Sequence, residues 1–517
     1  MCRKDLALRK TQTFIAGCLL IFLITSCGQR SQKKNSFTIN APAAPEVNSQ
    51  YGWLNTDRPY SLKDFRGKIV LLDFWTLGCI NCQHIIPDID SLEKKFSKEL
   101  VVIGVHSAKF KSEKETERIR SAISKFGIDH PVVNDADYAV WKAYGVEAWP
   151  TLILVSPDGK IAFRTEGENV YKLLKPQIEK LARDYEGAID TKPFVSKQQE
   201  SKAPLAPLKF PSKLIADETE NIWLSDYGND RVIKIDKTGK ILETIGKGVR
   251  GFEDGNFSTA AFNGPQGLAI RNDSLWIADS KNNSIRLANL TTRQVTTVAG
   301  NGKMGYYYNN DKWNEPVLPN SPWDLFIDSS YLYIADAGNH QLLRMDVTNN
   351  KVYRFAGSGH EGIKDSDLRT STFSQPSGLV KKGDEMYVAD PEASAIRKID
   401  LESGTVKTIL GKGLFKFGDE DGDTKNVLLQ HCVGITEDGG NIYIADTYNG
   451  KVKLLNPKTK MVTTLVADLN EPNDVLIIGR ELWITDTNND QIIKFDLVSK
   501  VKEVVNVKNQ STGTPSK

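Results

Sequence analysis

The amino-acid sequence predicts a multidomain protein in which an α/β domain is followed by an all-β propeller of six blades. Over residues 50–186, short apolar runs such as "KIVLLDFW" alternate with segments of helical spacing such as "CQHIIPDIDSLEKKF", a pattern typical of an α/β sheet. After residue 207 the pattern changes to six similar segments, which indicates internal repetition. A chain of 517 residues with 40% hydrophobic residues is long enough to build both units around packed cores.

The N-terminus predicts export to the cell envelope. Several basic residues precede an apolar run over residues 14–24, which is shorter than the roughly 20 residues that a membrane span needs. We expect a signal peptide over residues 1–26, and "ITSC", which ends at Cys27, resembles the lipobox of bacterial lipoproteins. This resemblance implies lipidation of Cys27 and attachment to a membrane on the periplasmic side. The residue after Cys27 is Gly28 and not the Asp that retains lipoproteins in the inner membrane, which favours the outer membrane. The alternative to a cleaved signal peptide is an uncleaved anchor helix.

Charge and cysteine content narrow the classes of function. The 67 Lys and Arg residues nearly balance the 65 Asp and Glu residues, and no basic block lies outside the signal, so nucleic acid is not expected as a partner. Of six cysteines, Cys79, Cys82 and Cys432 would remain as thiols after cleavage and lipidation. Three thiols are too few to cross-link a protein of this size, and Cys432 is most simply a small buried side chain.

Polar segments set the predicted boundaries of the domains. Residues 27–49 have no apolar period and are expected to form a flexible tether, and residues 187–207 a linker between the two domains. The α/β domain then spans residues 50–186 and the propeller residues 208–507. Residues 508–517 are expected to be a disordered tail.

The repeated segments each combine an aromatic, an aliphatic and a small residue with a following Asp. They are "IWLSDYGND" (222–230), "LWIADSKNN" (275–283), "LYIADAGNH" (332–340), "MYVADPEAS" (386–394), "IYIADTYNG" (442–450) and "LWITDTNND" (482–490). The shortest step between successive Asp residues suits a blade of four strands, and the longer steps carry an extra Gly-rich segment. Six blades follow, and the pattern resembles the NHL-repeat propeller.

The repeated Asp residues have two possible roles. A ring of carboxylates could bind a cation, but five of the six are followed three residues later by Asn, with Ala393 in the fourth segment. Asp and Asn that bracket a short turn favour local hydrogen bonds and therefore a structural role. His340, His360 and His431 fall at non-equivalent places in their repeats, so they do not support a metal site, and no cofactor is predicted.

The most specific chemical signal is the pair Cys79 and Cys82, which lies where a predicted buried strand gives way to a helix. A thiolate at a helix N-terminus is stabilised by the helix dipole and by free backbone N–H groups, so Cys79 is the predicted nucleophile. Cys82, one turn later on the same face, is placed to resolve a mixed disulfide. Zinc is the alternative, but no second Cys/His cluster supplies the remaining ligands.

The surroundings of the pair resemble the thioredoxin superfamily, in particular its membrane-tethered, TlpA-like branch. The resemblance implies that Asp73 is the buried acid that accepts a proton from the second thiol, and that Trp75 flanks the active site. It also implies that Trp149, Pro150 and Thr151 form a cis-proline turn that binds extended substrate. Two departures are Ile80-Asn81 between the cysteines and Gly78 in place of a frequent tryptophan.

Together, the parts resemble NHL-repeat proteins with an N-terminal thioredoxin-like domain. This implies a thiol–disulfide oxidoreductase that acts on protein thiols or disulfides and is recycled by a separate redox partner, with a protein ligand on the propeller. The alternative is a non-catalytic binding scaffold in the periplasm or at the cell surface, whose thioredoxin fold is inert.

Overall fold

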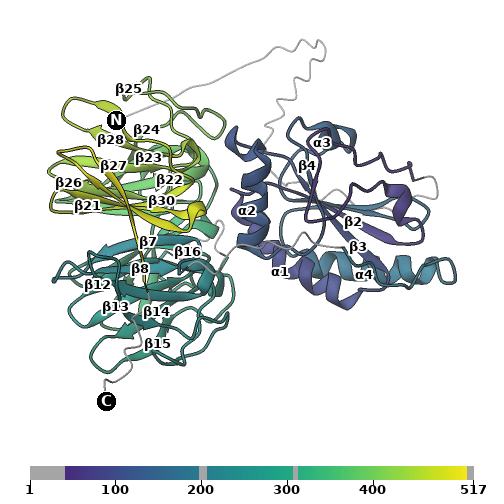
Figure 1. The fold of residues 1–517 in the computed structure, drawn as a ribbon, viewed down its shortest axis with the longest axis horizontal. Coiled ribbons are helices and arrows are strands. Elements are labelled where there is room, and N and C mark those ends of the chain that lie inside the picture. The colour runs from purple at the N-terminus through teal and green to yellow at the C-terminus, as the bar shows by residue number, and fades with distance from the viewer. Residues whose placement is uncertain (1–40, 197–206, 307–312, 509–517) are drawn as a thin grey trace, which may run out of the picture.

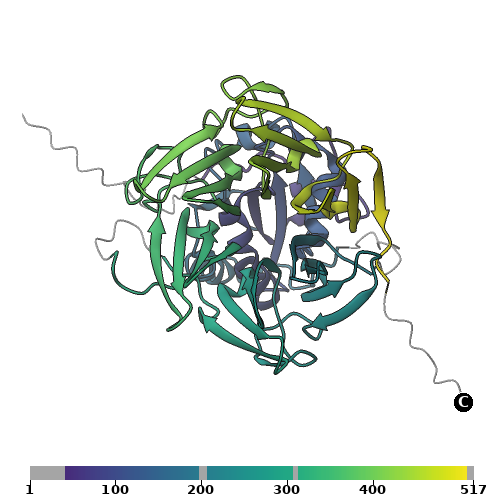
Figure 2. The same ribbon diagram turned by 90° about the vertical axis from the view of Figure 1, so that its left-hand side faces the viewer.

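A computed structural model describes residues 41–196, 207–306 and 313–508, which form two units in contact (Figure 1). The first is an α/β domain and the second a ring of six antiparallel sheets (Figure 2). The predicted fold class is therefore confirmed. The predicted signal peptide and Cys27 lie outside the described residues, as do residues 509–517 of the predicted tail. Within the described ranges, no helix has the length and apolar character needed to cross a membrane.

One mixed sheet forms the centre of the α/β domain, with strand order β1-β4-β3-β2-β5-β6. Its strands are β1 (Trp53–Leu54), β2 (Ile69–Trp75), β3 (Leu100–His106), β4 (Val132–Asn134), β5 (Thr151–Val155) and β6 (Ile161–Glu166). The three strands β2, β3 and β4 run parallel, whereas β1, β5 and β6 pair antiparallel with their neighbours. All residues of β2 are buried, which explains its continuous apolar sequence.

Four α-helices cover this sheet: α1 (Ile80–Lys95), α2 (Thr116–Phe126), α3 (Ala139–Ala143) and α4 (Val170–Asp184). Helices α1 and α4 share one hydrophobic core with β2, β3 and β5, while α3 packs in a second core on the other face. Helix α2 and the start of α1 face the propeller (Figure 1). Pro87 lies inside α1.

Parts of the predicted tether and linker pack on the α/β domain instead of standing free. Ala44 donates its backbone N–H to Gly159 at 3.0 Å, and Val47 is fully buried in the core. On the linker side, Phe194 packs edge-on against Phe65 with ring centroids 5.3 Å apart. The ends of the predicted segments 27–49 and 187–207 that adjoin the α/β domain are therefore not flexible tethers. A few apolar residues and backbone hydrogen bonds anchor them to the domain.

Each blade of the propeller is an antiparallel sheet of four main strands, and three blades carry a short fifth strand. Blades one to three comprise β7 (Pro211–Ala216), β8 (Ile222–Asp226), β9 (Arg231–Ile235) and β10 (Ile241–Ile245); β11 (Gly255–Asn256), β12 (Pro265–Arg271), β13 (Ser274–Asp279), β14 (Ser284–Asn289) and β15 (Gln294–Ala299); and β16 (Pro322–Asp328), β17 (Tyr331–Asp336), β18 (Gln341–Asp346) and β19 (Lys351–Ala356). Blades four to six comprise β20 (Ser366–Asp367), β21 (Gly378–Lys382), β22 (Glu385–Asp390), β23 (Ala395–Asp400) and β24 (Thr405–Leu410); β25 (Gly422–Asp423), β26 (Ile435–Asp438), β27 (Asn441–Asp446), β28 (Lys451–Asn456) and β29 (Met461–Val466); and β30 (Pro472–Ile478), β31 (Glu481–Asp486), β32 (Gln491–Asp496) and β33 (Lys502–Val505).

The repeated Asp residues are fixed by hydrogen bonds within the propeller, as their structural interpretation predicts. Five of them accept the side-chain N–H of the Asn three residues later, at 2.7 to 2.8 Å. All six also accept a backbone N–H from the loop before the first main strand of the blade (β7, β12, β16, β21, β26 or β30), from residues 209, 263, 320, 374, 430 and 470, at 2.5 to 2.8 Å. Each Asp therefore joins the second strand of a blade to the loop that enters it.

We predict that Asp336→Ala destabilises the propeller by about 2 to 4 kcal/mol, since the backbone N–H of Asn320 and the side chain of Asn339 lose their acceptor in a buried site. Asp273→Ala, at an exposed turn between β12 and β13, is the matched control and should change stability by less than about 0.5 kcal/mol. Urea unfolding followed by tryptophan fluorescence compares the two. Equal midpoints would contradict the structural role of the repeated Asp.

Candidate active site

The pair Cys79 and Cys82 lies at the junction of β2 and α1. Cys79 is the N-cap residue of α1, with φ −79° and ψ 111°, and its Sγ accepts the backbone N–H of Cys82 at 3.3 Å. Both thiols are free, and the residues are 9% and 3% exposed. Burial, followed by the proximity of Cys79, raises the pKa of the Cys82 thiol well above its usual value. The arrangement thus favours Cys82 as a protonated thiol and gives Cys79 the helix N-terminus that stabilises a thiolate.

Asp73, on β2, is a buried acid near Cys82. Burial raises the pKa of Asp73 to about 7, and the neighbouring His130 only partly offsets this effect. Within the described ranges, Asp73 Oδ1 has no hydrogen-bond partner. The charge of Asp73 in turn contributes to the raised pKa of Cys82, so the two groups interact. A carboxyl group with a pKa near neutrality can both accept and return a proton in the working pH range.

The aromatic and cis-proline residues lie on the strands beside the pair. Trp75 ends β2 and packs edge-on against His106, with ring centroids 4.8 Å apart. The Trp149–Pro150 peptide bond is cis, and Trp149 Nε1 donates to the carbonyl of Ser107 at 2.9 Å. Thr151 is fully buried and its hydroxyl bonds within the turn. Its backbone pairs with Phe74 of β2 and Glu166 of β6, so Thr151 fixes the turn from within.

Glu113, a residue not identified from the sequence, organises the loop before Cys79. Its carboxylate accepts the hydroxyl of Thr76 at 2.6 Å and the backbone N–H groups of Gly78 and Phe110 at 2.9 and 3.0 Å. Burial raises the pKa of Glu113, against the effect of the Thr76 hydrogen bond. One buried carboxyl group therefore ties the loop that bears Cys79 to the segment that follows β3.

The propeller has six equivalent positions at the end that faces the α/β domain, one before the first main strand of each blade, and we call them the mouth ring. All six residues have positive φ, and they are Phe210, Gly264, Ser321, Gln375, His431 and Glu471. The first strands of neighbouring blades contact one another around the propeller axis, so these residues surround the same end of the central channel (Figure 2).

Four members of the mouth ring contact the α/β domain. Ser321 Oγ lies 2.7 Å from His84 Nε2, and Gln375 Oε1 accepts the backbone N–H of Ile80 at 3.2 Å. Glu471 Oε1 lies 3.2 Å from Arg118 Nη1, and His431 packs against the ring of Phe110 with centroids 5.3 Å apart. The sequence could have indicated this ring. The repeats are otherwise similar, but the residue before the first main strand differs in type from one repeat to the next.

The docked propeller also accounts for Gly78. A Cβ atom at this position would lie 2.9 Å from Glu392 Oε1 and 3.1 Å from His431 Nε2, both in the propeller. A larger side chain would displace one of these groups or separate the domains. Glu113 Oε1 of the α/β domain would also lie 3.1 Å from this Cβ atom, so side chains of both domains limit the size of the residue before Cys79.

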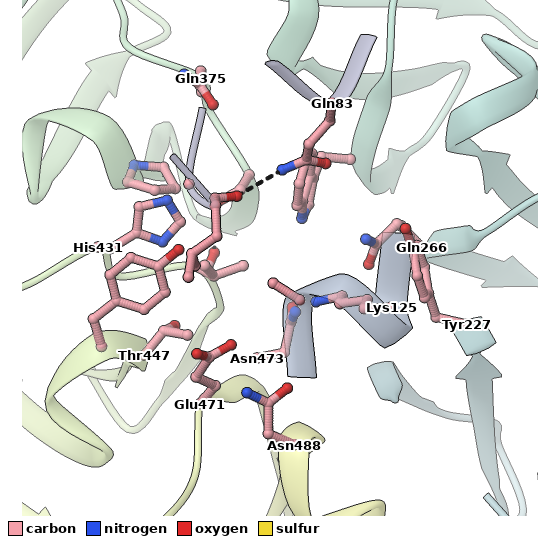
Figure 3. Close-up of a pocket in the computed structure, with 18 of the residues that line it drawn as sticks. Gln83, Lys125, Tyr227, Gln266, Gln375, His431, Thr447, Glu471, Asn473 and Asn488 are labelled. Atoms are coloured by element: carbon pink, nitrogen blue, oxygen red, sulfur yellow. Dashed lines mark hydrogen bonds between the residues drawn. The ribbon is translucent and has the colours of Figure 1, made fainter. Parts of the chain in front are cut away.

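A cavity of about 60 Å³ lies beside this loop, between the two domains (Figure 3). Its walls come from the loop before α1, from α2 and from the propeller, and include Leu77, Gly78, Gln83, Lys125, Tyr227, Gln266, Gln375, His431, Thr447, Glu471, Asn473 and Asn488. Gln83 Nε2 closes one side by donating to the carbonyl of Leu77 at 3.1 Å. Across the described parts of the chain, no group of three or more His, Cys, Asp or Glu side chains is placed to hold a metal ion.

Comparisons with known proteins match both domains. A thioredoxin-like family model matches residues 67–161. The chain is 39% identical over 495 residues to Protein SUPPRESSOR OF QUENCHING 1, chloroplastic, of Arabidopsis thaliana, covering 88% of this chain and 47% of that protein, so it spans about half the length of this relative. It is 38% identical over 522 residues to NHL repeat-containing protein 2 of Gallus gallus, covering 90% of this chain and 72% of that protein.

A partial match concerns the first domain alone. Thiol-disulfide oxidoreductase ResA of Bacillus thuringiensis subsp. konkukian is 28% identical over 120 residues, covering 23% of this chain and 67% of that protein. The resemblance to a thioredoxin-like domain joined to an NHL-repeat propeller is thus confirmed.

We predict that Asp73→Asn stabilises the protein at pH 8 but not at pH 4. The pKa of Asp73 is about 7 in the folded state, whereas that of an unfolded Asp is about 3.9. Between these two pH values the folded protein binds a proton at Asp73 that the unfolded chain has released. The free energy of unfolding therefore falls as the pH rises from about 3.9 to about 7. Asn stays neutral, so its advantage over Asp grows to at most about 4 kcal/mol above pH 7. Urea unfolding of both proteins at the two pH values measures this difference, and a pH-independent difference would contradict it.

Proposed function

This chain belongs to the family of NHL repeat-containing protein 2, and from that premise we propose that it is a thiol–disulfide oxidoreductase acting on protein cysteines through Cys79 and Cys82. The observation that carries the proposal is the position of Cys79 at the N-cap of α1, with Cys82 a buried thiol one turn later. This is the arrangement that exchange chemistry requires, with one sulfur favoured as thiolate and a second within reach of the first.

In the reducing direction, the Cys79 thiolate attacks one sulfur of a substrate disulfide. A Cys79–substrate disulfide forms, and the other substrate sulfur leaves as a thiolate. Cys82 then transfers its proton to Asp73 and attacks Cys79 Sγ, which releases the second substrate thiolate. The substrate has gained two electrons and the pair has become a disulfide. A separate redox partner reduces it again, and the reverse sequence oxidises a substrate dithiol.

The surrounding residues would orient the substrate. Trp75 and Trp149 border the pair, and the cis-proline turn at Trp149 and Pro150 would receive an extended segment of the substrate, with Thr151 fixing the turn from within. The propeller would bind a protein ligand through the loops around its axis, since loops held by rigid strands are common binding surfaces.

We also propose that the protein acts outside the cytoplasm, anchored by lipid on Cys27 on the periplasmic side of the envelope, with the outer membrane favoured over the inner. The support is the basic N-terminus, the short apolar run and "ITSC". Metabolic labelling with a fatty-acid analogue tests this proposal, because Cys27→Ala should abolish the label.

A second candidate is a binding scaffold without catalysis, and one observation favours it. The propeller covers the loop that carries Cys79, and both cysteines are buried in this arrangement. The scaffold predicts binding that is indifferent to alanine at both cysteines and a pair that forms no reversible disulfide.

We predict that Cys82→Ser accumulates mixed disulfides with client proteins, because the Cys79 attack proceeds while the resolving thiol is absent. Cys79→Ser should trap none. Non-reducing gels after acid quenching, with a Cys432→Ser protein as the control, separate these outcomes, and identical patterns in all variants would favour the scaffold.

The reduction potential of the pair then gives the direction of electron flow. A value near or below about −250 mV indicates a reductant, and one above about −200 mV an oxidant or isomerase.

A further inference from the structure

A buried ion pair joins the two domains beside the thiol site. Lys109 lies between β3 and the 3₁₀-helix η2 (Ser112–Lys114), and its ammonium pairs with Glu392 of the 3₁₀-helix η6 (Pro391–Ala393) in the fourth blade. The two side chains are 7% and 3% exposed. Lys109 also donates to the backbone carbonyl of Glu392 at 3.3 Å. Both charged groups are thus withdrawn from water and depend on each other.

This ion pair lies against the loop that carries Cys79. Glu392 Oε1 lies 3.3 Å from His431 Nε2 and faces Gly78, the residue that precedes Cys79. Burial opposes the charge of Lys109, but Glu392, Glu361 and Cys79 outweigh burial and raise its pKa. Burial would raise the pKa of Glu392, but Lys109 and His431 together outweigh burial and lower it to about 2. At neutral pH a cation and an anion therefore both act near Cys79.

Glu392 is not a repeated feature of the propeller. The same position, two residues after the repeated Asp, is held in the other blades by Gly228, Lys281, Gly338, Tyr448 and Asn488. The acidic residue thus occurs in the blade that faces the Cys79 loop. The same blade also has Ala393 where the others have Asn, so its turn departs from the repeat at the point of contact.

We propose that Lys109 and Glu392 are a positioning pair that sets the reactivity of Cys79, so that the propeller forms part of the thiol site. This inference rests on the proposed function and adds the second domain to it. Lys109 supplies the positive charge that stabilises a Cys79 thiolate, and Glu392 holds that ammonium in place while offsetting part of its charge.

Other titratable groups near this site must be distinguished from the pair. Glu113 of the α/β domain accepts the backbone N–H of Gly78 in the loop before Cys79. Glu361 and His431 belong to the propeller, whereas Cys82 belongs to α1 and Asp73 to β2. Burial raises the pKa of both Glu113 and Glu361. Glu113, Glu361, His431 and Asp73 remain in every variant below, and position 82 is the same in all proteins compared within one measurement, so differences between variants report the pair.

The test is the pH dependence of Cys79 alkylation by iodoacetamide, read at the Cys79 peptide by mass spectrometry in the full chain carrying Cys82→Ser. Lys109→Met should raise the midpoint by about one pH unit and slow alkylation at pH 7 about tenfold, because a stabilising charge is lost. Lys109→Arg should keep the parent midpoint. Glu392→Gln should lower the midpoint, because Gln still accepts the ammonium hydrogen bond but no longer offsets its charge.

Lys281→Met is the matched control, since Lys281 occupies the repeat position of Glu392 in the second blade and also contacts the α/β domain, 5.8 Å from the ring centroid of Phe126. It should leave the midpoint unchanged. Shifts of Lys109→Met and Glu392→Gln in the same direction, or no shift in either, would overturn the proposal, because a purely structural role does not predict opposite signs.

A second measurement keeps this inference separate from the proposed function. With Cys82 intact, the equilibrium constant for oxidation by glutathione should rise for Lys109→Met and fall for Glu392→Gln, since stabilising the thiolate stabilises the reduced pair. If the parent forms no reversible disulfide while the alkylation midpoints shift in opposite directions, the proposed oxidoreductase function is wrong and the proposed role of the Lys109–Glu392 pair is supported. If the parent exchanges reversibly and neither quantity shifts, the positioning pair alone is wrong.

Discussion

The contact on which the rest of the molecule depends is the docking of the N-terminal end of α1 onto the mouth ring of the propeller. Six equivalent backbones reach this ring with positive φ, and the residue before each of them donates its backbone N–H to the repeated Asp of the same blade. Because the backbone is fixed in this way, the side chain at each ring position can differ without disturbing the blade. Gln375 and Glu471 use that freedom to bind two separate helices of the α/β domain.

Buried charge makes this docking specific. Separating the domains would expose both partners of the Lys109–Glu392 pair, whereas a shifted register would leave each charge buried without its partner, which is strongly unfavourable. The same logic operates at the propeller axis, where Lys213 lies 2.6 Å from Asp324 and 3.1 Å from Asp474 of different blades. Polar pairs of this kind select one arrangement among several that apolar contacts alone would allow.

The sequence predicts the features that depend on local pattern. The six repeats specify the blades, and the apolar run of β2 followed by Cys79 and Cys82 places the pair at a helix N-terminus. Glu392 could not be identified in the same way, because it lies 283 residues from Lys109 and its importance appears only when the domains meet. The tether was predicted too long for a related reason, since burial of Val47 is a tertiary effect with no local signal.

Gly78 shows why the redox behaviour of single-domain relatives does not transfer directly to this chain. In the sequence of the α/β domain alone, Gly78 before the first cysteine indicates only that no side chain is present at this position. In the docked protein, the space beside it is occupied by Glu392 and His431 of the propeller together with Glu113 of the α/β domain. Side chains from both domains therefore surround the residue that precedes Cys79. Any movement of the propeller away from α1 would break the Gln375–Ile80 hydrogen bond and withdraw Glu392 and His431 from the loop that carries Cys79.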